Sequence, residues 1–273
     1  YKPASLIKHV NAVWATACKA ARCELNVIVP DDCAPVGPFK GTAHAVHRCL
    51  DVLNGRARDI VAVFAADHVY RMDVRQMADF HLSRDADVSV AALSVPIGDA
   101  RAFGIMATDG RGRIRRFAEK PRQPEPIPGN PGRAYASMGN YLFKPRALIE
   151  LLDDAARRGG TDFGAHIMPT LTASGMHAFG YDFARNELPG IQPYEDRMYW
   201  CDVGTLTALA RARADVAGDF PRFDLRNREW PIRRDLLARL PARTLTRADK
   251  KDRFAAAPLP GRRPTPQTIP GYR

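Results

Sequence analysis

Apolar positions along the chain recur either at helical spacing or as short continuous runs, which predicts alternating helices and strands. Residues 6–17 carry apolar side chains three and four positions apart, as on one face of a helix. Residues 24–30 are a short β-branched stretch, and residues 60–66 (I-V-A-V-F-A-A) are continuously apolar. A run of the second kind is typical of a strand buried on both faces of a sheet. We therefore predict a helix over 6–17 and strands over 24–30 and 60–66.

The alternation continues through the middle of the chain. A helix over 42–54, a helix over 74–83 and a strand over 88–95 extend the β-α-β order, which indicates a parallel sheet covered by helices on both faces. The turn at 109–112 separates two apolar runs and predicts a hairpin over 104–118. Further elements are expected as a strand over 138–143 and helices over 146–157, 167–173 and 205–216, the last with Thr205 as N-cap.

Composition changes near residue 221. We expect a folded domain over 1–220, a linking segment over 221–240 that is still ordered around Trp230, and a basic, proline-rich tail over 241–273. The tail has six prolines, many arginines and no apolar period, a composition typical of disordered segments.

Charge is concentrated in the same region. The chain has 41 Lys and Arg against 30 Asp and Glu, a net charge of +11, and residues 221–273 contribute +9 of it through 14 basic and 5 acidic residues. A uniformly basic surface of the kind that binds nucleic acid is therefore absent from the body of the chain, and nucleic-acid binding stays open only for the tail. Five scattered cysteines without a C-x-x-C pair fit reduced thiols in the cytoplasm, and no apolar run approaches the roughly 18 residues that span a membrane.

Two aspartates follow apolar segments where a strand is expected to end. Asp67 comes after the run at 60–66, and Asp202 lies between Tyr199-Trp200-Cys201 and a helix start. Ligands of open α/β sheets bind at the carboxyl ends of strands, and Mg²⁺ is held by one or two carboxylates plus water and phosphate oxygens. The pair is a candidate Mg²⁺ site. A turn-forming role for Asp67 and a helix-start role for Asp202 are the alternatives.

Two further segments carry candidate binding residues. In Glu119-Lys120-Pro121 the proline is expected to hold Lys120 extended, where its ammonium could pair with a sugar phosphate while Glu119 bonds hydroxyls. An exposed ion pair is the alternative. In Phe39-Lys40-Gly41-Thr42 the glycine permits close approach of the backbone to a ligand and Thr42 can cap a helix, although an ordinary capping motif explains the same letters.

Taken together, these segments resemble the bacterial glucose-1-phosphate adenylyltransferases (ADP-glucose pyrophosphorylases) in order and spacing, over roughly residues 1–235. Eight segments carry the resemblance. Residues 38–45 are similar to the family's W-Y-R-G-T-A-D-A, residues 64–70 to L-A-G-D-H-I-Y, residues 103–106 to F-G-V-M and residues 117–121 to F-V-E-K-P. Residues 136–141 are similar to A-S-M-G-I-Y, residues 162–164 with 168–169 to D-F-G with a downstream I-P, residues 199–205 to Y-W-R-D-V-G-T and residues 229–233 to N-W-P-I-R.

The resemblance implies a Rossmann-like (GT-A-like) nucleotidyltransferase fold of the α/β class, a mixed sheet with helices on both faces. It implies that ATP and glucose 1-phosphate give ADP-glucose and diphosphate with Mg²⁺, on the route to glycogen. Asp67 and Asp202 would hold the metal, Asp67 would also orient the reacting phosphates, and Lys120 would bind the phosphate of glucose 1-phosphate. The other substrate-binding positions it implies are Phe39 and Gly41 toward the nucleotide, Glu119, Ser137 and Asp162 toward the sugar, and Thr42, Gly104 and Trp200.

Departures from the family pattern leave alternatives open. We expect the glycine-rich phosphate loop, the first strand and the C-terminal left-handed β-helix through which the family forms homo-oligomers to be missing from these 273 residues. Phe39 stands for a tyrosine, Ala66 for a glycine, His44 for an acid and Asn140 for an apolar residue. A catalytically inactive or regulatory paralogue that binds sugar phosphate, or a transferase that uses another nucleotide, would fit the same residues.

Overall fold

The computed structural model describes residues 3–29, 37–53 and 60–231, and the chain divides into two compact units. Of the described residues, 3–27 belong to one unit and those from 28 onward to the other. Helix α1 (Ala4–Ala20) in the first unit confirms the helix expected over 6–17. Of the sequence expectations, the tail over 241–273, Ile232 and Arg233 lie outside the described residues.

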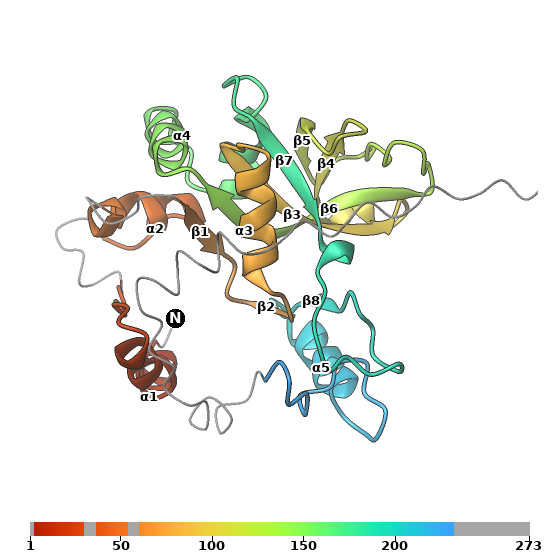
Figure 1. The fold of residues 1–273 in the computed structure, drawn as a ribbon. Helices are drawn as coiled ribbons and strands as arrows, with labels where there is room; N and C mark the ends of the chain where they lie inside the picture. Colours follow the sequence, from red (N-terminus) through yellow and green to blue (C-terminus); the bar gives the residue numbers. More distant parts are fainter. Residues whose placement is uncertain (1–2, 30–36, 54–59, 232–273) are drawn as a thin grey trace, which may run out of the picture. The chain divides into compact units, whose positions relative to one another are not determined.

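The second unit is built on a mixed sheet with strand order β5-β4-β6-β3-β7, in which β1 also pairs with β6 (Figure 1). The bounds are β1 (Val61–Phe64), β3 (Val88–Pro96), β4 (Gly104–Thr108), β5 (Ile114–Glu119), β6 (Arg133–Phe143) and β7 (Ala178–Asp182). The long strand β6 lies next to β3 on one edge and next to β4 and β1 on the other, and all of these pairs are antiparallel. Only β3 and β7 pair in parallel among the described strands.

The mixed sheet confirms the expected fold class. Three local expectations are wrong. The β-α-β order predicted a parallel sheet, but among the described strands only β3 and β7 pair in parallel. β1 is a half-buried strand whose described partner is β6 alone, rather than a strand covered on both faces. Residues 24–29 form no strand. Apolar patterning reports burial and local propensity, but the direction of a strand and the existence of its partner depend on distant parts of the chain.

Helices cover both faces of the sheet, as expected. Along β3, Val88, Val90 and Ala92 belong to a core that includes Leu148 and Leu152 of α4 (Pro145–Arg157). Ala91 of the same strand belongs to a second core with Met77 of α3 (Val74–Ser83). Successive strand residues point to opposite faces, so one strand serves both cores.

The helix ends mostly follow the sequence signals. The helix over 74–83 is confirmed, with Asp73 accepting a hydrogen bond from the Arg75 amide, and α5 (Leu206–Asp215) is capped by Thr205 as predicted. The helix expected over 42–54 is divided into α2 (Thr42–Arg48) and the 3₁₀ turn η2 (Leu50–Leu53). The one expected over 167–173 lies earlier, as a π-helical turn, η4 (Phe163–Ile167), and the 3₁₀ turn η5 (Met168–Thr170). No described helix is both long and apolar enough to cross a membrane.

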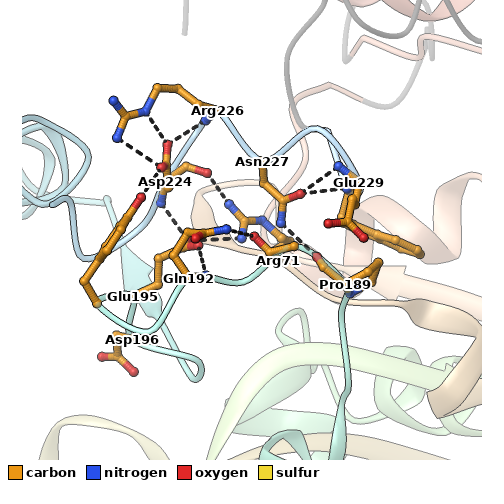
Figure 2. A network of polar contacts seen from close by, with 12 residues as sticks. Arg71, Pro189, Gln192, Glu195, Asp196, Asp224, Arg226, Asn227 and Glu229 are labelled. Atoms are coloured by element: carbon orange, nitrogen blue, oxygen red, sulfur yellow. Dashed lines mark hydrogen bonds and ion pairs between the residues drawn. The ribbon is translucent and has the colours of Figure 1, made fainter. Parts of the chain in front are cut away.

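A second, two-stranded sheet joins β2 (His68–Tyr70) to β8 (Trp200–Asp202) in antiparallel register. Arg71 follows β2 directly and is buried, with 4% of its side chain exposed. Its guanidinium donates to Glu195 Oε2 at 3.2 Å and to the Asp224 carbonyl, and it lies over the Phe223 ring. Glu195 also accepts hydrogen bonds from the Gln192 and Asp224 amides (Figure 2). Arg71 thus attaches the segment after α5 to the end of β2.

Replacing Arg71 by methionine tests this attachment. Arg71→Met leaves the Glu195 carboxylate buried without its cation, so we expect the free energy of unfolding to fall by about 3–5 kcal/mol. The control is Arg115→Met, which removes an ion pair between Asp109 and Arg115, a side chain that is 60% exposed. We expect this variant to lower the free energy of unfolding by less than about 1 kcal/mol. Urea unfolding of both variants measures the difference, and equal losses would contradict a buried anchor.

Candidate functional site

Pairing of β2 with β8 brings the two predicted metal carboxylates together. His68 lies opposite Asp202 in the register, and the Val203 amide donates to the Asp67 carbonyl at 2.9 Å. One carboxylate oxygen of Asp67, one of Asp202 and one ring nitrogen of His68 all lie within 4.8 Å of one another. The predicted convergence of the two aspartates is therefore observed, and it includes a histidine that the sequence argument did not single out. The only signal for His68 was its position directly after Asp67.

The helix-start alternative for Asp202 does not hold. Asp202 is the last residue of β8, and Thr205 caps the helix instead. Asp202 Oδ1 accepts a hydrogen bond from the Gly204 amide at 2.7 Å, which fixes the carboxylate at the turn between strand and helix.

The carboxylates open into a cavity of about 720 Å³ between the two sheets and the turn after α4. It gathers most of the residues proposed from the sequence: Thr42, Asp67, Gly104, Glu119, Lys120, Ser137, Asp162, Trp200 and Asp202. Aromatic side chains that the sequence argument missed also line it, namely Phe103, Tyr141 and Phe163. Burial raises the pKa of the Tyr141 phenol to about 12, so this group stays a neutral hydrogen-bonding hydroxyl at physiological pH.

Glu119 occupies a space that two glycines leave open. A Cβ added at Gly104 would lie 2.7 Å from Glu119 Oε2, and one at Gly164 would lie 2.9 Å from the same atom. Burial raises the pKa of the Glu119 carboxyl, opposed by the charge of Lys120 and assisted by that of Asp162. The glycine at 104, expected as a binding position, therefore makes room for the Phe117 ring, whose Cζ would lie 2.6 Å from the added Cβ, and for a carboxylate that faces the cavity.

Lys120 departs from the predicted extended conformation. Its φ is +47°, in the left-handed region, and its amide donates to the Phe103 carbonyl at 3.0 Å where the chain turns after β5. This region is costly for a residue with a side chain, by about 1–3 kcal/mol, and such residues cluster at functional sites. The ammonium is 3.9 Å from Glu119 Oε1 with two thirds of the side chain exposed, so it is accessible to an anion in the cavity.

The loop at 39–42 is held by backbone contacts to the turn after α4. Thr42 is the first residue of α2 rather than its cap: its hydroxyl donates to Asp162 Oδ2 at 2.9 Å and accepts from the Phe163 amide. A Cβ at Gly41 would overlap the Thr161 carbonyl oxygen, which accepts hydrogen bonds from the Ala43 and His44 amides.

Phe39 and Gly41 do not line the cavity. The Phe39 ring contacts His44 edge-on, with 6.4 Å between the ring centroids, and Gly41 faces the backbone of Thr161. Their place beside a nucleotide stays a prediction. Gly41 is required where its backbone packs against Thr161, and the sequence could not show this because the two residues are far apart along the chain.

The donor set at the strand ends fits a divalent cation. Two carboxylates supply the anionic oxygen ligands that such ions bind, and the remaining positions would face the cavity, where phosphate oxygens and water can enter. The imidazole adds a nitrogen donor, a ligand type common to transition-metal ions.

Comparison with known proteins shows the family of the chain. Residues 15–218 match the family described as nucleotidyl transferase, and the chain belongs to that family. Among curated relatives, it is 44% identical over 234 residues to the glucose-1-phosphate adenylyltransferase of Thermodesulfovibrio yellowstonii, covering 85% of this chain and 56% of that protein. It is 39% identical to that of Thermus thermophilus, covering 89% and 60%, and 41% identical to that of Mycobacterium marinum, covering 85% and 57%. The chain thus spans somewhat more than half the length of these relatives.

Adding one methyl group at Gly41 tests the contact with Thr161. In Gly41→Ala the new Cβ meets a backbone oxygen that cannot rotate away, so we expect a loss of about 1–3 kcal/mol in the free energy of unfolding. Gly98→Ala is the matched control, because nothing lies within 4 Å of its added Cβ, and it should stay within about 0.5 kcal/mol of the parent. Thermal and urea unfolding measure both, and a neutral Gly41→Ala would show that the loop moves freely.

Proposed function

We propose that this chain carries the catalytic centre of a glucose-1-phosphate adenylyltransferase, which converts ATP and α-D-glucose 1-phosphate to ADP-glucose and diphosphate in glycogen synthesis. The observation that carries the proposal is the convergence of Asp67 and Asp202 on one cavity with Lys120 and Glu119. The names of the relatives support the choice of substrates. A cytoplasmic location suits a reaction that consumes ATP, and the scattered cysteines agree with it.

In this proposal the sugar phosphate lies between Lys120 and Glu119. The Lys120 ammonium pairs with the phosphate of glucose 1-phosphate, while the carboxylates of Glu119 and Asp162 accept hydrogen bonds from sugar hydroxyls. Gly104 and Gly164 set the position of the Glu119 carboxylate, and the Thr42 hydroxyl fixes that of Asp162. Both sugar-binding carboxylates are therefore preorganised, so little ordering is needed when the substrate binds.

The transfer step follows from this placement. An oxygen of the sugar phosphate attacks the α-phosphorus of ATP, the new P–O bond forms as the bond to the departing diphosphate breaks, and Lys120 keeps the attacking phosphate oriented. Asp67 and Asp202 would hold Mg²⁺, which when bound neutralises charge on the phosphate oxygens. Ser137 and Trp200, which line the same cavity, complete the wall around the substrates.

Synthesis of ATP from ADP-glucose and labelled diphosphate tests the reaction in the reverse direction. We expect divalent-cation-dependent label in ATP, and a fall in kcat of about 100-fold or more in Asp67→Asn and in Asp202→Asn, since each loses a charge at the metal. The control Asp219→Asn alters an exposed carboxylate outside the cavity and should retain activity.

The outcomes of this assay separate the alternatives. If no label enters ATP but calorimetry still detects binding of glucose 1-phosphate, the chain is a protein that binds sugar phosphate without catalysing the transfer. Label in UTP or dTTP from the matching nucleotide sugars, without label in ATP, would show another nucleotide specificity.

A single methyl group tests the sugar pocket. In Gly164→Ala the added Cβ displaces the Glu119 carboxylate, so we expect the Kd for glucose 1-phosphate to rise roughly tenfold, the effect of weakening one hydrogen bond to a charged group. The KM for ATP should stay the same. Gly98→Ala is again the control. An unchanged Kd for the sugar phosphate in Gly164→Ala would show that Glu119 does not bind the sugar.

A further inference from the structure

We propose that His68 Nε2 is a third protein ligand of the divalent cation and that this nitrogen makes the site prefer Mn²⁺ to Mg²⁺. The inference rests on the proposed function in that it concerns the same metal site. The inference requires only that the cation binds, so it can be tested even if the chain does not catalyse the transfer.

The hydrogen bond at Nδ1 determines which nitrogen is available. His68 Nδ1 is 2.9 Å from the Met138 carbonyl oxygen, which can only accept, so Nδ1 carries the hydrogen. The lone pair of the neutral ring is then on Nε2. A metal-binding histidine commonly donates its other ring N–H to a carbonyl or carboxylate in this way, which fixes the tautomer and the direction of the ring.

Nε2 is free to bind an ion. It lies 3.6 Å from Asp67 Oδ1, too far for a hydrogen bond but close enough for two atoms that share a cation, and the three ligand atoms of the cluster fall within 4.8 Å. Only 12% of the side chain is exposed, so water competes little for this nitrogen.

Packing holds the ring in this direction. Trp200 contacts the imidazole edge-on, with 5.0 Å between the ring centroids. A Cβ at Gly139 would lie 3.1 Å from His68 Cε1, and Gly139 has a φ of +70°, so the chain leaves space for the ring where a side chain would be both crowded and strained.

The nitrogen changes the preference of the site. Mg²⁺ takes oxygen ligands and keeps several waters, whereas first-row transition ions bind nitrogen more readily; Mn²⁺ binds imidazole less tightly than Co²⁺ or Zn²⁺ but more tightly than Mg²⁺. Two carboxylates alone would serve Mg²⁺ well, so any additional affinity from His68 goes mainly to the ions that bind nitrogen. Each ion would still bind through Asp67 and Asp202.

Electron spin-echo spectroscopy of bound Mn²⁺ tests the ligand directly. With Mn²⁺ added to the full chain we expect modulation from a coordinated ¹⁴N nucleus, and its loss in His68→Phe, which keeps a ring against Trp200 but has no nitrogen. The Kd for Mn²⁺ should rise tenfold or more, while the Kd for Mg²⁺, measured by competition, should change less than threefold. The control His177→Asn replaces an exposed histidine outside the cavity and should retain the ¹⁴N signal and both affinities.

A second variant tests the same nitrogen in case His68→Phe fails to fold. His68→Gln supplies an amide oxygen in place of the nitrogen, so it should lose the ¹⁴N signal and the preference for Mn²⁺ while still binding Mg²⁺. Mn²⁺ bound to the parent chain without ¹⁴N modulation would overturn the inference, as would equal loss of both ions in His68→Gln. An inactive parent chain with ¹⁴N modulation would retain this inference and reject the transferase.

Discussion

The antiparallel pairing of β2 with β8 is the interaction on which the site depends. His68 begins β2 directly after Asp67, and Asp202 ends β8, so the register of the two strands sets the distance between the candidate ligand atoms. A shift of one residue would turn Asp202 to the opposite face and separate the carboxylates. The mixed sheet forms much of the wall of the cavity, and the two-stranded sheet places the carboxylates of Asp67 and Asp202 beside it.

Buried polar contacts just after β2 keep such a short ladder in place. Strands of three residues form few hydrogen bonds, and Arg71 adds a desolvated contact to Glu195 and to the backbone of Asp224. The segment after α5 is thereby attached to the strand beside which the candidate metal ligands lie. A buried ion pair gains little net energy over an apolar pair, but it tolerates few alternative arrangements, which suits a place where register matters.

Glycines shape the rest of the cavity through the side chains they lack. Gly104 and Gly164 leave room for the Glu119 carboxylate, and Gly139 leaves room for the His68 ring. Each places a polar group close to a neighbouring backbone, where even one methyl group would displace it. Lys120 differs from these glycines, because it has a side chain and is nevertheless held at positive φ where it lines the cavity.

The sequence by itself determined the helices at 74–83 and 146–157, the 104–118 hairpin and the choice of Asp67, Asp202, Glu119 and Lys120 as candidates, because local periodicity, turn residues and motif order are all written along the chain. It did not determine strand direction, the left-handed Lys120, the reason for Gly41, or the inclusion of His68. Those features depend on contacts between segments far apart in sequence. Only the tertiary structure decided which nitrogen of His68 faces the carboxylates, because the Met138 carbonyl that fixes it belongs to another strand.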